Sequence, residues 1–162
     1  MCIRDRLHLQ SLTALAHFDF NMAGAYSYEQ ALHVMRRLRL SNVDLVEQFR
    51  RAVFNVVARN QDDHTKNISF LMNRRGEWTL SPAYDITYSY NPSGAWTSSH
   101  QMTLNGKRDG FDRDDIASFA SAADLTRVEG LRILDQILEV VAQWPTFGSA
   151  AGVDQALSLI HI

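Results

Sequence analysis

The stretch that decides the fold reads NQDDHTKN and occupies residues 60–67. Before it, apolar residues recur at helical spacing from Val43 onward, so we expect a long, mostly buried helix that ends near Arg59. After it, residues 68–71 and 78–80 are rich in β-prone side chains and flank a turn sequence, which predicts a short hairpin. The polar octapeptide is therefore predicted to connect a helix to a hairpin.

The rest of the chain reads as helices around one long loop. Capping signals and apolar spacing predict helices over residues 7–17, 27–40, 43–59, 113–122 and 126–144, the last terminated by Pro145. Residues 88–110 are rich in Ser, Thr, Asn and Gly. A loop of that length in a compact domain more often takes part in function than merely connects two elements. The fold class predicted is mainly α with one small β-hairpin.

Composition limits what this chain can be. With 162 residues, 46% of them hydrophobic, it is long enough for one domain with a real core. A net charge of −2 gives no global attraction to nucleic acid or to an anionic membrane. The single cysteine, Cys2, excludes an internal disulfide, and no run of about 18 apolar residues predicts a membrane span. We expect a cytoplasmic protein.

The two ends differ in character from the rest. Residues 1–6 and 157–162 resemble peptides that arise when sequencing-adapter DNA is translated, so we expect both to be foreign to the protein. The predicted domain therefore spans residues 7–156.

The polar octapeptide carries groups that phosphoryl transfer requires. Asp62 stands five positions before Asn67, the spacing of a protein-kinase catalytic loop in which the Asp is the base and the Asn binds metal. Asp85 follows the hairpin, where a second metal-binding carboxylate is expected, and Pro82 favours irregular backbone there. Such oxygen donors suit Mg²⁺.

Several roles stay open at this level. Asp63 competes with Asp62 for the role of base, although the spacing to Asn67 favours Asp62. Lys66 could place its charge on a phosphate oxygen. His64 could contact the nucleotide, brace Asp62, or simply be hydrogen-bonded within the loop. The whole block could also be a solvated polar turn.

These residues resemble a known family. Residues 60–70, followed by residues 80–86, are similar to the D-x-H-x-K-N and P-x-Y-D signatures in the C-terminal half of HipA-type toxin kinases. The resemblance implies the helical C-terminal lobe of a protein-kinase-like fold. It also implies a serine/threonine-protein kinase from a bacterial type II toxin–antitoxin pair, with a protein substrate, held inactive by a small helix-turn-helix antitoxin that binds operator DNA.

Matching positions imply the site residues. Asp62 would accept the proton, and Asn67 and Asp85 would bind Mg²⁺. The nucleotide contacts implied for ATP are His64, Thr65, Lys66, Asn67, Tyr84 and Asp85. Lys107 and Arg108 are weaker candidates for contact with DNA or a partner, and the near-neutral charge favours DNA contact only through the antitoxin.

The chain also departs from the family. Nothing upstream of Asp62 resembles a Gly-rich phosphate loop or a nucleotide-binding lysine of an N-terminal lobe, so we expect this chain to be catalytically incomplete. Three alternatives stay open: a hydrolase using a metal at Asp62, Asp63, His64 and Asp85, a phosphotransferase acting on small molecules, and a non-catalytic module that docks the antitoxin.

Overall fold

The computed structural model describes residues 7–153 and confirms a mainly helical protein. The suspected foreign ends and the predicted domain end at residue 156 lie outside the described part. In chain order the elements are β1 (His8–Ser11), α1 (Leu12–Ala16), α2 (Tyr28–Arg37), α3 (Asn42–Val57), η1 (Thr65–Asn67), β2 (Ser69–Met72), β3 (Trp78–Leu80), α4 (Arg113–Ala120), η2 (Ser121–Ala123), α5 (Arg127–Val141) and α6 (Trp144–Ala150). No helix within residues 7–153 is both long and apolar enough to cross a membrane.

The hairpin belongs to a three-stranded antiparallel sheet in the order β1-β2-β3. Strands β2 and β3 form the predicted hairpin, with Leu71 opposite Thr79. The first strand pairs with β2 from a distant part of the chain, with Leu9 opposite Leu71. The sheet therefore fastens the start of the described chain to the segment that follows the polar octapeptide.

The predicted helix over residues 7–17 is wrong in its first half. Residues His8–Ser11 are strand, and α1 begins only after Ser11, whose hydroxyl accepts a hydrogen bond from Ala14 N at 3.3 Å. Leu7 and Leu9 are each 55% exposed, so their helical spacing does not mark a buried helix face. Pairing with β2 decides the conformation, because strand preference depends strongly on the neighbouring strand.

The prediction that a single helix continues to Pro145 is also wrong. Helix α5 ends at Val141, and the separate helix α6 begins at Trp144 with Pro145 in its first turn. A proline is tolerated there because the first N–H groups of a helix have no intrahelical acceptor and the ring presets the helical φ. Pro145 thus starts a helix.

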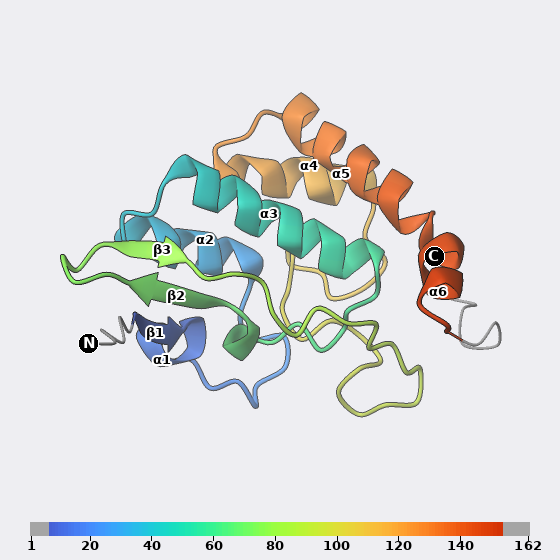
Figure 1. Ribbon diagram of the computed structural model, residues 1–162, viewed down its shortest axis with the longest axis horizontal. Coiled ribbons are helices and arrows are strands. Elements are labelled where there is room, and N and C mark those ends of the chain that lie inside the picture. Colours follow the sequence, from blue (N-terminus) through green and yellow to red (C-terminus); the bar gives the residue numbers. More distant parts are fainter. Residues whose placement is uncertain (1–6, 154–162) are drawn as a thin grey trace, which may run out of the picture.

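Helix α3 is the centre of the core. It lies between the α2 and sheet side of the molecule and the side formed by α4 and α5 (Figure 1). Its Phe49 is fully buried and stacks on Phe119 of α4, with ring centroids 5.0 Å apart. Because α3 is packed on both sides, its end holds the following polar loop at a defined place in the fold.

The predicted capping signals are confirmed, and one of them also connects two elements. Capping boxes begin α2 at Ser27, α3 at Ser41 and α5 at Thr126. In the α3 box, Asp44 Oδ2 accepts from the Ser41 N–H at 3.2 Å, while its Oδ1 accepts from the Leu80 N–H at 3.3 Å. The start of α3 is therefore fastened to β3 as well as capped.

Gly130 of α5 allows the close approach of α4. A Cβ built on Gly130 would lie 2.5 Å from Ala120 Cβ and 3.4 Å from Phe49 Cζ. We expect Gly130→Ala to lower the free energy of unfolding by about 1–3 kcal/mol, since overpacking outweighs the gain of roughly 1 kcal/mol in helix propensity. Urea unfolding followed by circular dichroism measures this.

The matched comparison is Gly130→Ala in an Ala120→Gly background, where the opposing methyl group is gone. There the cost of the added methyl should fall close to zero or change sign. An equal loss of stability in both backgrounds would contradict the packing explanation.

Candidate functional site

The two polar motifs, residues 60–67 and residues 80–86, lie side by side in the fold. The Tyr84 hydroxyl contacts the Lys66 carbonyl oxygen and the Ser69 hydroxyl. Farther along, Asn60 Nδ2 donates to the Asp85 carbonyl oxygen at 3.3 Å. These contacts hold the segment that follows β3 against the loop that follows α3, so the residues singled out from both motifs share one region.

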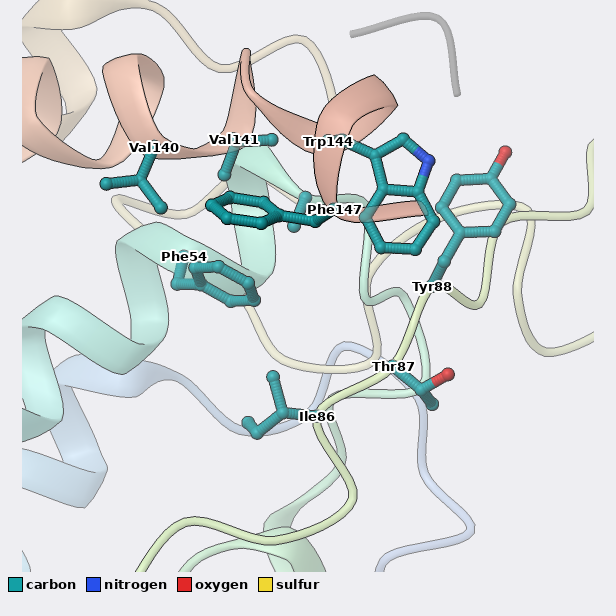
Figure 2. Close-up of a pocket in the computed structure, with 9 residues that line it drawn as sticks. Phe54, Ile86, Thr87, Tyr88, Val140, Val141, Trp144 and Phe147 are labelled. Carbon is teal, nitrogen blue, oxygen red and sulfur yellow. The ribbon is translucent and has the colours of Figure 1, made fainter. Parts of the chain in front are cut away.

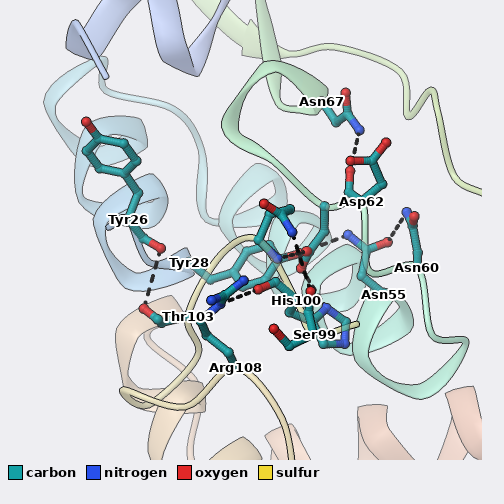
Figure 3. Close-up of polar contacts among 12 residues, drawn as sticks. Tyr26, Tyr28, Asn55, Asn60, Asp62, Asn67, Ser99, His100, Thr103 and Arg108 are labelled. Atoms are coloured by element: carbon teal, nitrogen blue, oxygen red, sulfur yellow. Dashed lines mark hydrogen bonds and ion pairs between the residues drawn. The ribbon is translucent and has the colours of Figure 1, made fainter. Parts of the chain in front are cut away.

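Asp62 presents an open carboxylate. Its side chain is 47% exposed, and His64 Nε2 lies 3.9 Å from Asp62 Oδ1, beyond hydrogen-bond distance. Its main-chain carbonyl accepts a hydrogen bond from Asn67 Nδ2 at 3.0 Å (Figure 3). That bond closes the loop and uses the amide nitrogen of Asn67, which leaves the amide oxygen as the atom suited to a cation.

Asp63, the neighbouring residue, is used in the opposite way. Its side chain is fully buried and accepts hydrogen bonds from the Tyr28 hydroxyl at 2.7 Å and the Gln101 N–H at 2.7 Å. His100 Nδ1 lies 2.8 Å from the same carboxylate. The carboxylate of Asp63 is therefore surrounded by protein groups, while that of Asp62 faces solvent.

A chain of buried side chains extends from Asp63 toward Asp85. Asn55 Nδ2 donates to the Tyr28 hydroxyl at 2.9 Å, and Asn60 Nδ2 donates to Asn55 Oδ1 at 3.0 Å (Figure 3). Burial, together with the nearby charge of Asp63, raises the pKa of Tyr28 well above its usual value, although the bond from Asn55 opposes the shift. Tyr28 thus stays neutral and remains a donor to Asp63.

Asp85 has an unusual backbone conformation. Its φ is +55°, in the left-handed region that Asp and Asn enter more readily than most residues with a side chain. The residue is exposed, and Asn60 holds its carbonyl oxygen. Asp85 is therefore exposed at the surface, while the hydrogen bond from Asn60 fixes its main chain.

The residues between Asp62 and Asn67 have separate surroundings. Thr65 is buried, and its hydroxyl lies 2.6 Å from that of Thr13, so it anchors the loop to α1. Lys66 is exposed, with Nζ 3.5 Å from the centroid of the Phe20 ring. His64 meets the same ring edge-on, at 6.4 Å between centroids. Phe20 therefore supports both basic side chains of the loop.

Lys107 and Arg108 both make contacts within the protein. Lys107 Nζ lies 2.7 Å from Asp115 Oδ2 and 3.4 Å from Asp112 Oδ2. Arg108 Nε donates to the His100 carbonyl oxygen at 2.6 Å. Arg108 thus braces the backbone of a residue that contacts Asp63, and Lys107 holds the start of α4.

Sequence reasoning missed the residues that surround Asp63. Tyr28 is visible in the sequence only as part of a capping box, Asn55 lies within an amphipathic helix, and His100 lies in the long loop. Two signals in the sequence point toward them. The loop of residues 88–110 is long, and the spacing to Asn67 gives a role to Asp62 but leaves the adjacent Asp63 without one. Neither signal identifies the partners, because they come from three distant segments.

The donor set suits Mg²⁺ shared with a phosphate. Within residues 7–153, no three or more His, Cys, Asp or Glu side chains converge as a metal-binding group. Asp85 would offer one carboxylate and Asn67 one amide oxygen. Mg²⁺ commonly takes one or two protein carboxylates and completes its shell with water and substrate phosphates. These residues fit that pattern.

Comparison with known proteins identifies similar sequences and a similar fold. A family model described as HipA-like C-terminal domain matches residues 3–144. A protein of Sinorhizobium fredii (strain NBRC 101917 / NGR234), named "Putative kinase Y4dM", is 33% identical over 91 residues, which cover 55% of this chain and 22% of that protein.

A solved structure shares the fold. It is the complex of HipA, HipB and operator DNA from the Shewanella oneidensis MR-1 toxin–antitoxin system; the match has a TM-score of 0.65 and 18% sequence identity. It covers 85% of this chain and 36% of the matched chain. The chain therefore spans about a fifth of the curated relative and about a third of the structural neighbour.

Replacement of each of the two adjacent aspartates by Asn should change the stability of the protein to different degrees. We expect Asp63→Asn to lower the free energy of unfolding by about 2–3 kcal/mol, because it removes a buried charge that accepts several hydrogen bonds. Asp62→Asn should change it by less than about 0.5 kcal/mol, as is usual for an exposed site. Chemical denaturation of both variants measures the difference. Equal losses would contradict the division between a buried and an open carboxylate.

The lowered pKa of Asp115 predicts that the protein loses stability in acid. Burial alone would raise its pKa, but hydrogen bonds from Lys107, the Asp112 N–H and Asn105 lower it from the usual 3.8 to about 2. The folded state therefore binds this proton less readily than the unfolded state, so the stabilisation is present above about pH 4 and is lost as the pH falls toward 2. In Asp115→Asn this part of the pH dependence should disappear from unfolding curves. An unchanged slope between pH 4 and pH 2 would contradict it.

Proposed function

Because the chain belongs to the HipA-like C-terminal domain family, we propose that it carries the catalytic loop of a kinase that transfers the γ-phosphate of ATP to a serine or threonine hydroxyl of a protein. The observation that supports this most is the contrast between the two adjacent aspartates. Asp63 is fully buried and hydrogen-bonded, while Asp62 presents its carboxylate to solvent. The open carboxylate lies in the motif that Tyr84 and Asn60 hold against the Asp85 segment.

In the proposed reaction, the oxygen of the substrate hydroxyl bonds to the γ-phosphorus of ATP while the bond from that phosphorus to ADP breaks. Asp62 takes up the proton that the hydroxyl loses. Asn67, through its amide oxygen, and Asp85, through its carboxylate, would hold Mg²⁺. When bound, the cation neutralises charge on the phosphates. The bond from Asn67 Nδ2 to the Asp62 carbonyl keeps the proton acceptor and the proposed metal ligand in a fixed relation.

The other residues of the motif support the nucleotide in different ways. Thr65 and Tyr84 have hydroxyls already bonded within the protein, so we propose that they shape the loop. Lys66 carries an exposed ammonium group at the Phe20 ring, and we propose that it contacts a phosphate oxygen. His64 lies between that ring and Asp62, and we propose that it borders the nucleotide.

The proposed partner is a HipB-like helix-turn-helix antitoxin, and DNA would be reached only through it. The support is the shared fold with a HipA structure solved together with HipB and operator DNA. Lys107 and Arg108 already contact Asp115 and the His100 carbonyl, so a DNA contact would compete with bonds inside the protein. ATP and an operator-bound antitoxin both imply the cytoplasm as the proposed location.

The site bears differently on each rival function. A hydrolase with a resident zinc-like metal would call for three protein ligands, and Asp63 is already bonded to other groups. A small-molecule acceptor would use the same Asp62, Asn67 and Asp85, so it differs only in the substrate. A docking module without catalysis would have no need of an open Asp62.

The decisive variants are Asp62→Asn and Asp85→Asn in the full-length protein that carries this segment. Each should lower the transfer of labelled phosphate from ATP to protein by at least about 10²-fold, the usual scale for a general base or a lost metal ligand. Asp109→Asn, in an exposed loop, should retain activity. Phosphate transfer that survives in Asp62→Asn would contradict the proposed role of Asp62 as proton acceptor. If both variants leave the biological effect of the full-length protein unchanged, the non-catalytic docking module would be favoured.

The isolated 162-residue chain gives a second test. Its sequence offers no Gly-rich phosphate loop upstream of Asp62. We expect it to turn over ATP no faster than its own Asp62→Ala variant. Turnover clearly above that variant would contradict the expectation that this segment is catalytically incomplete.

A further inference from the structure

The exposed ring of Phe20 lies against two side chains of the proposed catalytic loop. Lys66 Nζ is 3.5 Å from the centroid of the ring, which is within the range of a cation–π interaction. The imidazole of His64 meets the ring edge-on, and His64 Nε2 is 3.9 Å from Asp62 Oδ1. A ring that belongs to neither polar motif therefore contacts two residues to which the proposed function assigns a place at the nucleotide.

The position of Phe20 in the chain does not call for an aromatic residue. It is the second residue of a turn in which Met22 N donates to the Asp19 carbonyl oxygen at 3.1 Å and Asp19 Oδ1 accepts from Asn21 N at 3.0 Å. Small and polar residues dominate such turns. The ring is 38% exposed, so burial in the core does not account for it. Its contacts with the proposed catalytic loop give this position a physical reason for an aromatic side chain.

Other exposed apolar side chains gather at a different place. Ile86, Tyr88 and Phe147 line an apolar pocket to which the ends of α3 and α5 also contribute (Figure 2). Phe20 lies outside that pocket, and the face of its ring meets an ammonium group. The surroundings of Phe20 are thus those of an aromatic side chain that holds a cation.

Helix α1 fixes the main chain on both sides of this contact. The hydroxyl of Thr13, in α1, lies 2.6 Å from that of Thr65, the residue before Lys66. The carbonyl oxygen of Thr13 accepts from Phe18 N at 3.0 Å, at the start of the loop that carries Phe20. Because the main chain is held on both sides, the long side chain of Lys66 is the part that the ring can order.

The far end of the loop that carries the ring is fastened as well. Asp19 N donates to the Tyr26 hydroxyl at 2.8 Å. Gly24 N donates to the Gln101 carbonyl oxygen at 2.8 Å, which joins this loop to the loop of residues 88–110. The aromatic side chain at the tip therefore has a defined place beside the polar octapeptide.

A ring that already holds an ammonium group favours the binding of a phosphate. A lysine side chain loses conformational freedom when its charged end is fixed, and a contact that orders it beforehand lowers that entropic cost. An ammonium group has three N–H donors, so one that lies on a ring face still has donors directed away from the ring. The cation–π contact and a bond to a phosphate oxygen are therefore compatible.

We propose that Phe20 is a positioning residue for ATP: its ring, braced by the edge-on contact with His64, orders the ammonium group of Lys66 so that it meets a phosphate oxygen. The proposal rests on the proposed function, since it explains how a residue assigned there to the phosphates is held in place. It makes the strength of ATP binding depend on an aromatic side chain outside the two motifs and leaves the chemistry of the reaction unchanged.

The first experiment tests the contact itself in the 162-residue chain by NMR. The sequence has two lysines, Lys66 and Lys107, so their ε-methylene signals are easily told apart by substitution. Protons above the face of an aromatic ring are shifted upfield, so the Lys66 signal should lie upfield of that of Lys107, whose ammonium group lies at Asp115. The difference should disappear in Phe20→Leu and persist in Phe20→Tyr. Equal positions of the two signals in the wild-type chain would overturn the proposal.

Kinetics in the full-length protein that carries this segment tests the effect on ATP. Phe20→Leu should raise KM for ATP at least about threefold and leave KM for the acceptor protein unchanged, whereas Phe20→Trp, which keeps an aromatic face, should stay near wild type. The matched control is Met22→Leu, in the same turn and 56% exposed, which should change neither constant. An equal rise of KM for ATP in Phe20→Leu and in either of the other two variants would overturn the proposal.

A double-mutant cycle with Lys66→Met separates this proposal from the function on which it rests. In the Lys66→Met background, Phe20→Leu should raise KM for ATP no further. If phosphate is transferred and Phe20→Leu has the same effect in both backgrounds, the ring does not act through the lysine, so the proposal fails while the kinase assignment stands. If the wild-type protein transfers no phosphate from ATP, the assignment of the ring to ATP is overturned together with the proposed function, even where the lysine signals show the contact.

Discussion

The buried carboxylate of Asp63 is the constraint on which the site depends. An ionised carboxylate inside a protein costs several kcal/mol unless nearly every lone pair is satisfied. Its partners are Tyr28 at the start of α2 and residues 100–101 of the long loop, so it joins both segments to the loop that follows α3. In the same loop the side chain of the neighbouring Asp62 is 47% exposed, so the two adjacent carboxylates have opposite surroundings.

The fold could be predicted where local signals and tertiary packing agree. Helix α3 combines a capping box with continuous apolar spacing, and the hairpin of β2 and β3 has a turn sequence between two β-prone runs. The prediction failed at β1, because the conformation of His8–Ser11 depends on pairing with β2, far along the chain. It failed again at Pro145, because a proline that ends one helix and one that begins another look alike in sequence.

The candidate site could be predicted only as far as short-range spacing reaches. Asp62 and Asn67 are candidates because their interval along the chain matches that of a kinase catalytic loop, and Asp85 because a second carboxylate is expected after the hairpin. The supports were not predictable in the same way: the bond from Tyr84 to Lys66 and that from Asn60 to Asp85 each join separate segments. Thr65 could be named from the motif, but only the fold reveals that its hydroxyl faces Thr13.

The positive φ of Asp85 has a consequence for how this position can vary. A longer carboxylate such as Glu keeps the charge, but it lacks the short polar side chain that makes the left-handed region accessible to Asp and Asn. Charge-conserving replacement by Glu would therefore combine a displaced carboxylate with a strained main chain, whereas Asn would keep the backbone and remove only the charge. Backbone geometry and the proposed role in binding Mg²⁺ thus favour the same amino acid here for independent reasons, and Gly would satisfy only the first.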